Sequence, residues 1–431
     1  MNKHFDLSSL NTDVLNELRF KTDPLADKTV ARIISSGFED QINQVFMSLV
    51  QNDSISKSTF ADFDTNLSQI LNDYFEKSAR MPTWLSKDQI AVGEQVFIDY
   101  GPEIFMLLNV SSLPMCYTCA KGAQVLYDTG RLLSHGNNVD PLARRLMETA
   151  QMILNVMSKG GLSPNGKGVI TIQKIRLIHA SIRYYLKHNQ HNHSPWDTEV
   201  FGEPINQEDL AGTLMSFGPV IISGLKHLEI NLSPEEISGY MHCWKVVGFL
   251  MGINDELLPD TYDDGFELAC RILSHQSDES KAGKALTTSC IKFINYTMPG
   301  NAFDELPAFL IDYFLKDFAE TSGKNLSKCI GIKNHEDIRD KIALSLSRYI
   351  VGEFSHLEDI AFVQKITQPF NKALLQGIIH HFNGGKDVHF LIPPSLKSSW
   401  KISEEWVNHK QITPDMWGNR LTWQKKKEII N

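Results

Sequence analysis

Apolar residues recur at helical spacing along most of this 431-residue chain, and this periodicity constrains its fold more than any other feature. Segments such as 38–50, 65–80 and 87–110 carry apolar residues every three or four positions, which is typical of amphipathic helices. The strict alternation of a half-buried strand is scarce, and no Asn-Gly or Asp-Gly turn lies between two alternating runs. The chain is therefore predicted to be all-α.

The pattern predicts further helices at 114–133, 141–157, 170–187, 207–229, 233–251, 263–275, 280–296, 305–321, 335–351 and 359–382. The run from 87 to 110 is interrupted at Gly101-Pro102. We expect a single multi-helix domain in three stretches. Residues 1–100 form an N-terminal helical extension packed on the core, 101–300 form the core, and 301–431 form a C-terminal helical region and tail.

Charge and cysteine content narrow the functional classes. The net charge is −9, from 42 basic and 51 acidic residues, whereas a nucleic-acid-binding protein usually shows a basic excess or a dense basic stripe. Six cysteines are too few for a disulfide framework, which indicates a reducing compartment. Residues 1–20 lack a signal-peptide pattern, and no apolar stretch reaches transmembrane length. We expect a cytoplasmic protein without nucleic-acid partners; the oligomeric state cannot be read from the sequence.

Residues 145–183 hold the most informative pattern: two amphipathic helices joined by a Gly-rich loop. On the second helix, His179 lies in an apolar stripe with Ile175, Ile178, Ile182 and Leu186. An imidazole in such a stripe can be a core histidine that hydrogen-bonds a backbone carbonyl, and periodicity alone favours that interpretation. It can also be a metal ligand, held on a rigid element as a haem iron requires.

Charged residues near His179 favour the second interpretation. Arg176 and Arg183 lie three positions before and four after it, and guanidinium groups placed there suit haem propionates, although a solvated surface is the alternative. On the preceding helix, Arg145, Glu148 and Thr149 fall within one turn and could form a polar patch over a cofactor. Their alternative is a surface Arg–Glu pair, worth only about 0–1 kcal/mol.

Three other motifs are interpreted as structural. Cys116-x-x-Cys119 has no second ligand pair and no βαβ context, so we expect two buried helix cysteines. His188-x-x-His191-x-His193 lies in a polar segment next to Pro195 and is expected to be solvated. The glycines of 160–168 do not form a phosphate-binding loop, because the P-loop pattern and a preceding strand are both absent.

Several blocks of the chain resemble the latex-clearing-protein and MpaB-like oxygenases, relatives of rubber oxygenase. The matching blocks are Leu113-Pro114 with Tyr117, then 122–132, 144–157, 174–183, 204–217, 232–253 and 390–396. The most specific are NQEDLAGTL (206–214) and the downstream His242-x-Trp244-x-x-x-Gly248. The resemblance covers most of residues 80–300.

This resemblance implies a globin-like helical core that binds haem b, with O₂ as co-substrate. It implies that His179 is the axial iron ligand and that Arg145 and Thr149 are the distal Arg and Thr. Arg176 and Arg183 match arginines that flank the ligand. The implied substrate is a small apolar alkene, such as an isoprenoid chain, whose C=C bond is cleaved. Glu148 would act as a general base at an allylic C–H, provided that burial raises its pKa.

The chain also departs from the rubber-cleaving members. Glu148 stands where they carry a lysine, and Asp128 and Thr129 stand where they use a glutamate on the helix before. The twin-arginine signal is absent as well. These departures argue against rubber as the substrate. Two alternatives stay open: a non-catalytic haem b protein (a sensor, carrier or electron-transfer module), and a helical scaffold without a cofactor.

Overall fold

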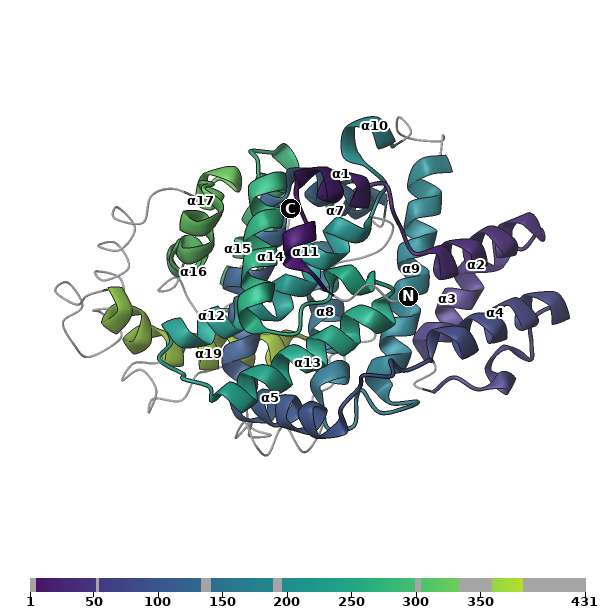
Figure 1. Ribbon diagram of the computed structural model, residues 1–431, viewed down its shortest axis with the longest axis horizontal. Coiled ribbons are helices and arrows are strands. Elements are labelled where there is room, and N and C mark those ends of the chain that lie inside the picture. The colour runs from purple at the N-terminus through teal and green to yellow at the C-terminus, as the bar shows by residue number, and fades with distance from the viewer. Residues whose placement is uncertain are drawn as a thin grey trace. The chain divides into compact units, whose positions relative to one another are not determined.

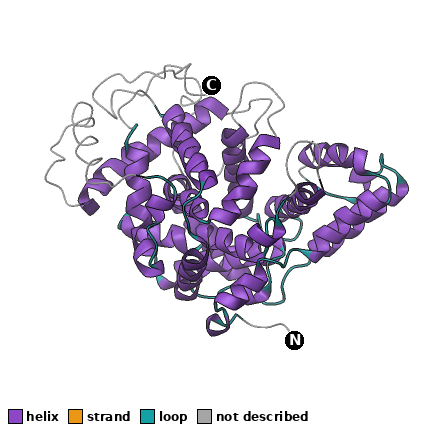
Figure 2. Ribbon diagram, turned by 90° about the horizontal axis from the view of Figure 1, so that it is seen from above, coloured by secondary structure: helices purple, strands orange, loops and turns teal. Residues whose placement is uncertain are grey.

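The computed structural model describes residues 5–51, 54–132, 141–188, 196–298, 304–332 and 359–382. Within these ranges every regular element is a helix, and β-pairing is limited to an isolated bridge between Cys119 and Ser277 (Figure 2). The all-α prediction is therefore confirmed.

The helices in chain order, as labelled in Figure 1, are α1 (Thr12–Leu18), α2 (Pro24–Ser35), α3 (Ile42–Gln51), α4 (Thr65–Ser78), α5 (Lys87–Leu107), a π-helix η4 (Leu108–Ser112), α6 (Leu113–Thr118), α7 (Ala120–Leu132), α8 (Pro141–Met157), α9 (Lys167–His188), α10 (Thr198–Phe201), α11 (Gln207–Phe217), α12 (Pro219–His227), α13 (Pro234–Met251), α14 (Tyr262–Gln276), α15 (Lys281–Thr297), α16 (Leu306–Ser322), α17 (Leu326–Cys329) and α19 (Asp359–Phe382). Short 3₁₀ turns lie at Leu7–Ser9, Glu39–Gln41, Lys57–Phe60 and Asp255–Leu257.

The chain divides into two compact units, each made of interleaved segments. Unit 1 contains residues 1–95, 152–214 and 235–265, and unit 2 contains 96–151, 215–234 and 266–431. The boundaries fall within the helices α5, α8, α11, α13 and α14. The predicted core at 101–300 thus contributes to both units, whereas helix periodicity suggested three consecutive stretches.

Most predicted helices are present, but two are broken by local backbone chemistry. The predicted helix 207–229 ends at Phe217, and Pro219 starts a new one, because Gly218 adopts φ −91° and ψ −97°. The predicted helix 114–133 is divided at Cys119, whose ψ of 90° is non-helical. The expected interruption of 87–110 is a kink at Tyr100 (φ −121°, ψ 18°), just before Gly101-Pro102. The predicted helix 335–351 and the tail from 383 lie outside the described residues.

Unit 1 is built around α9. Helices α2, α3 and α4 lie beside it (Figure 1), and their apolar side chains form one core cluster with Leu177 and Ala180 of α9. Polar contacts add specificity: the Tyr74 hydroxyl donates to the Gln173 carbonyl at 2.7 Å, and the Gln173 amide donates to the Phe75 carbonyl at 2.7 Å. The N-terminal helices therefore hold α9 along one side.

Unit 2 contains the π-helix and the helices around it. The Ser112 hydroxyl donates to the Ser216 carbonyl at 2.5 Å, and the Thr118 and Ser277 hydroxyls lie 3.0 Å apart. A Cβ added at Gly224 would lie 2.6 Å from a Leu107 methyl group, so any larger residue there would require the Leu107 side chain to move.

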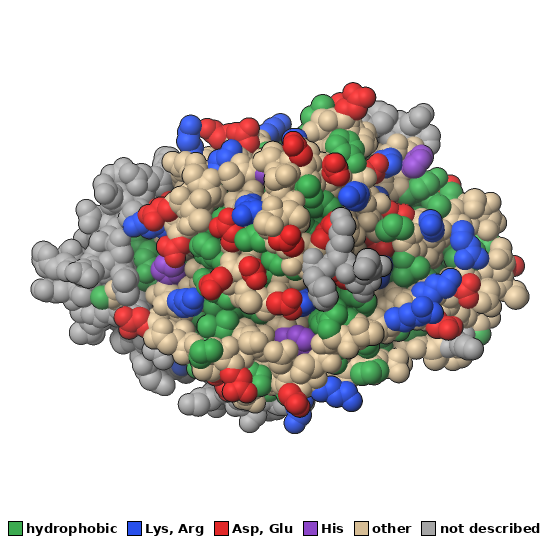
Figure 3. Space-filling view, in the orientation of Figure 1, with side chains coloured by type: hydrophobic (Ala, Val, Ile, Leu, Met, Phe, Trp, Pro, Cys, Tyr) green, Lys and Arg blue, Asp and Glu red, His purple; other side chains and the backbone are tan. Residues whose placement is uncertain are grey.

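The surface drawn in Figure 3 mixes acidic and basic side chains rather than separating them. Among the described helices, none has the length and apolarity needed to span a bilayer.

Candidate functional site

Helix α9 carries the predicted iron ligand and has two different flanks, since successive residues turn by about 100° around a helix axis. One flank, which we call the packed flank, carries Gln173, Arg176, Leu177, Ala180 and Arg183; all are buried except Arg176, which is 12% exposed. The other, the open flank, carries Ile175, Ile178, His179, Ile182 and Leu186, none of which is fully buried. Ile178 is 36% exposed. The apolar stripe was expected to face the core, but in the structure its side chains are only partly covered by the rest of the protein.

His179 lies on this open flank as a neutral imidazole. Desolvation by its surroundings, and then the charge of Arg183, lower the pKa of His179 to about 4. Among the described residues, no hydrogen bond is made by either of its ring nitrogens. A core histidine would be expected to hydrogen-bond a backbone carbonyl, and no described carbonyl accepts a hydrogen bond from His179.

His242 shows what a structural histidine looks like in the same unit. It is 9% exposed, and its Nε2 accepts a hydrogen bond from the Ser86 backbone N–H at 3.0 Å. Its ring contacts Trp84 edge-on, with the centroids 5.6 Å apart. Burial lowers the pKa of His242 as well, so the two histidines differ in hydrogen bonding rather than in charge.

The arginines that flank His179 are ion-paired inside the protein rather than solvated. Arg176 forms a two-fold contact with Asp23, in which Nη2 donates to Oδ1 at 2.7 Å and Nε donates to Oδ2. Arg183 donates through Nε to Asp27 Oδ1 at 2.7 Å and through Nη1 to the Ile205 carbonyl at 3.2 Å. The Nη2 of Arg183 is buried without a hydrogen-bond partner among the described residues.

Sequence reasoning missed Asp23 and Asp27. Their spacing of four residues at the start of a helix was a signal that both side chains point the same way. Nothing in the sequence indicates which helix they face. The assignment of Arg176 and Arg183 to propionates stays a prediction; the Nη2 of Arg183 is a nitrogen that makes no hydrogen bond among the described residues.

The NQED block has a structural role that was also missed. Gln207 donates to the Thr22 and Gly252 carbonyls at 2.8 and 2.9 Å, and its Oε1 accepts from the Asn254 N–H. Glu208 and Asp209 pair with Arg19 at 3.3 and 3.1 Å, and Arg19 is 2% exposed. This block therefore fixes the N-terminal segment to α11.

The distal residues lie on α8, whose bounds match the prediction. Arg145, Glu148 and Thr149 belong to unit 2, whereas His179 belongs to unit 1. Thr149 is half-buried, and the side chain of Arg145 lies outside the described residues. Glu148 is exposed, between buried Met147 and half-buried Thr149. This structure does not show the burial that a raised pKa would need, and the role of Glu148 as a general base stays a prediction.

The loop between α8 and α9 is closed tightly by backbone contacts. A Cβ at Gly161 would lie 2.3 Å from the Asn155 carbonyl oxygen, and one at Gly166 would lie 2.5 Å from the Gly160 oxygen. The buried carboxylate of Glu94 accepts a hydrogen bond from the Gly160 N–H at 2.8 Å. These glycines serve close packing, in agreement with the absence of a P-loop pattern.

The other sequence motifs gain no ligand-binding role. Cys116 and Cys119 are not in disulfides and are half-buried, and Cys119 lies just after the end of α6, so the prediction of two buried helix cysteines is wrong. His188 is exposed and stacks on Tyr184, whereas His191 and His193 lie outside the described residues. Across the described ranges, no cluster of three His, Cys, Asp or Glu side chains could hold a metal ion.

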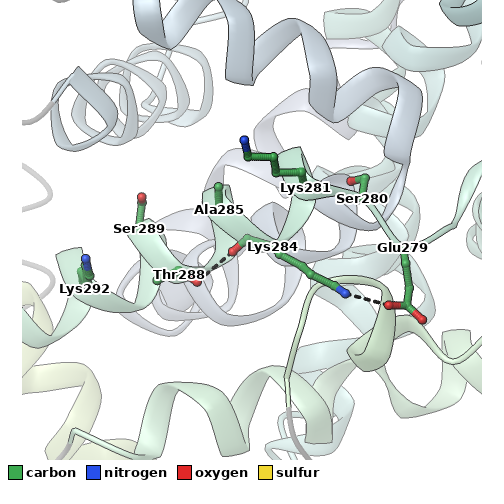
Figure 4. A pocket seen from close by; sticks show the side chains of 8 residues that line it. All are labelled: Glu279, Ser280, Lys281, Lys284, Ala285, Thr288, Ser289 and Lys292. Carbon is green, nitrogen blue, oxygen red and sulfur yellow. Dashed lines mark hydrogen bonds and ion pairs between the residues drawn. The ribbon is translucent and has the colours of Figure 1, made fainter.

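A groove in unit 2 runs along α15 and is shown in Figure 4. It is lined by Glu279, Ser280, Lys281, Lys284, Ala285, Thr288, Ser289 and Lys292. Lys284 points to Glu279, with 2.6 Å between Nζ and Oε2. Such a charged and hydroxylated lining does not suit an apolar substrate, and no predicted site residue takes part in it.

Comparisons with known proteins agree with the sequence resemblance. Residues 115–311 match the family model described as ER-bound oxygenase mpaB/B'/Rubber oxygenase, catalytic domain. The chain is 22% identical over 267 residues to a protein named Rubber oxygenase from Streptomyces sp. (strain K30). That match covers 62% of this chain and 61% of the relative, so it spans about three fifths of the relative's length.

The fold is shared with a solved structure of latex clearing protein LCP in the closed state. The TM-score is 0.64 at 19% identity, and the match covers 87% of this chain and 95% of the solved chain. At this level of identity the likeness concerns the fold.

Proposed function

Because this chain belongs to the family of latex-clearing-protein and MpaB-like oxygenases, we propose that it is a haem b-dependent oxygenase. It would use O₂ to cleave or oxidise the C=C bond of an apolar alkene, such as an isoprenoid chain. The observation that carries this proposal is His179, a neutral imidazole without a hydrogen bond on a partly exposed apolar flank.

The residues present on α9 fit a haem. A flat apolar macrocycle needs an apolar surface that the protein itself does not cover, and the isoleucines of the open flank provide one. The iron needs an unprotonated imidazole, and the lowered pKa of His179 provides it at neutral pH. A propionate needs a cationic donor, and the unpartnered Nη2 of Arg183 is one.

When bound, haem b supplies an iron centre for O₂ chemistry that the side chains cannot perform. The chain's own residues would hold and orient the reactants. His179 would bind the iron through a ring nitrogen, and Ile175, Ile178 and Ile182 would exclude water from the apolar face. Arg145 and Thr149 remain predicted distal groups from the family resemblance.

A non-catalytic haem b protein is the second candidate, and the exposure of Glu148 favours it. The rubber-cleaving members carry a lysine at this position, so the distal chemistry of this chain differs from theirs. A sensor, carrier or electron-transfer module would keep His179 and its flank but would not turn over an alkene.

An absorption spectrum of the purified protein tests the cofactor, recorded oxidised, reduced and reduced with CO. We expect a Soret band that is lost in His179→Ala and retained in the matched variant His242→Ala. A Soret band that survives His179→Ala would overturn the ligand assignment. A protein that binds no haem would support the scaffold interpretation instead.

Oxygen consumption then separates the two haem proposals. Squalene supplies isoprenoid C=C bonds, and saturated squalane is the matched control. We expect O₂ uptake with squalene alone. A haem-loaded protein that takes up no O₂ with squalene or with shorter isoprenoid alkenes would favour the non-catalytic alternative.

A further inference from the structure

A short N-terminal segment, residues 19–27, joins the ligand helix α9 to the start of α11. We call it the strap. Arg19 pairs with Glu208 and Asp209, and the backbone at Lys21 and Thr22 is held by Gln207: its N–H donates to the Lys21 carbonyl at 2.9 Å and its side chain donates to the Thr22 carbonyl at 2.8 Å. This end of the strap is therefore fixed by buried polar contacts.

The other end of the strap contacts α9 through two carboxylates. Asp23 is 2% exposed and has two roles: it caps α2 by accepting from the Leu25 N–H at 3.2 Å, and it binds the guanidinium of Arg176. One turn later, Asp27 binds Arg183. Breaking the buried Arg176–Asp23 pair would strand a charge in a medium of low polarity, so this contact constrains α9 strongly. The Arg183–Asp27 pair is partly exposed and adds a second, weaker contact.

Two of these four charges, Arg176 and Arg183, lie near His179 in the sequence of α9. Arg176 precedes it by three residues and Arg183 follows it by four, so both lie within about one turn of the imidazole. A charge about one helical turn away contributes to the electrostatic potential at the ring, most strongly in a medium of low polarity. Each arginine is balanced by its strap carboxylate, so the potential at His179 depends on the strap.

We propose that Asp23 and Asp27 are positioning residues for the haem site, which hold α9 in register and set the electrostatic potential at the ligand His179. This inference rests on the proposed haem function. It assigns a role to the strap, which lies outside residues 115–311, the part of the chain matched by the family model.

The reduction potential of the bound haem is the informative measurement, because a merely structural role would leave it unchanged. Removing a negative charge near the iron disfavours the more positive ferric state, so Asp23→Asn and Asp27→Asn should raise the potential. Arg183→Gln removes a positive charge and should lower it. The double variant Asp27→Asn/Arg183→Gln should return it towards the wild-type value.

Asp209→Asn is the matched control. It removes a carboxylate that pairs with the strap through Arg19, whereas Asp209 lies on α11 and pairs with neither arginine of α9. We expect it to lower the free energy of unfolding while leaving the potential unchanged. Haem affinity should fall in Asp23→Asn, because α9 loses a contact that holds it in register, and should change little in the control.

Asp27 is 30% exposed, so Asp27→Asn should remain folded even where Asp23→Asn does not. Equal potentials in Asp27→Asn, Arg183→Gln and wild type would overturn the inference. So would a potential that shifts as much in Asp209→Asn as in Asp27→Asn. Failure of the proposed function looks different, because the wild-type protein would then show no Soret band to titrate.

Discussion

The two flanks of α9 differ sharply although they belong to the same helix. Leu177 and Ile178 are neighbours in sequence, yet Leu177 is 1% exposed within the unit 1 core and Ile178 is 36% exposed. On the packed flank, Arg176 and Arg183 each meet a carboxylate. On the open flank, His179 has no hydrogen-bond partner among the described residues.

This difference separates a flank whose polar groups are paired within the protein from one on which a ligand is proposed to bind. Buried polar groups are normally paired, because an unpaired one costs about 1–3 kcal/mol. On the packed flank both guanidinium groups are paired with carboxylates, although the Nη2 of Arg183 has no hydrogen-bond partner among the described residues. The open flank has an imidazole without a hydrogen-bond partner among the described residues and an incompletely covered apolar surface. A bound haem would contact both.

The largest expected effect comes from breaking an ion pair of the packed flank. Arg176→Met leaves Asp23 buried without its partner, and we expect the free energy of unfolding to fall by about 3–5 kcal/mol. Urea unfolding monitored by circular dichroism measures this. The control is Arg32→Met on α2, whose contact with Asp73 spans 4.0 Å at the surface and should contribute under about 1 kcal/mol. Equal losses would show that Arg176 is not special.

An apolar truncation on the packed flank should be nearly as costly. Leu177→Ala removes a side chain from the core cluster of α2, α3 and α4 and leaves a cavity, so we expect a loss of about 2–5 kcal/mol. Thermal and urea unfolding provide the measurement. A loss below about 1 kcal/mol would mean that the N-terminal helices do not hold α9 as described.

Acid should destabilise the haem-free protein, because His179 on the open flank is harder to protonate in the folded state than in the unfolded state. The pKa of His179 is about 4 in the folded protein and near 6.5 when unfolded, so between these values only the unfolded state binds the proton. The free energy of unfolding should therefore fall as pH decreases from about 6.5 to about 4, by up to roughly 3 kcal/mol. Urea titrations at several pH values should show a shallower dependence in His179→Gln than in wild type.

The smallest effect on stability is expected at Ile178, which is adjacent in sequence to Leu177. Ile178→Ala on the open flank should change the free energy of unfolding of the haem-free protein by less than about 0.5 kcal/mol. The same variant should weaken haem binding in a Soret titration, because it removes apolar contact. A loss comparable to that of Leu177→Ala would show that protein, and not a ligand, covers this flank.

Local sequence patterns predicted much of the helical framework. Helix α8 runs over Pro141–Met157 as expected, and α9 spans Lys167–His188 against a prediction of 170–187. Their periodicity and helix-start signals act within a few residues, so they can be read directly. The break at Gly218-Pro219 could have been predicted, because proline restricts the conformation of the residue before it. The apolar spacing continues across the break, however, so periodicity alone did not indicate a boundary there.

The sequence by itself determined that the chain is helical, and that His179 shares one stripe with four aliphatic residues and lies between two arginines. Only the tertiary structure decided which flank of α9 is covered, that Asp23 and Asp27 neutralise the arginines, and that Glu148 is exposed. The physical reason is that burial and charge pairing depend on side chains about 150 positions away in the chain. A helix pattern states which residues point the same way, but it does not state what they will meet.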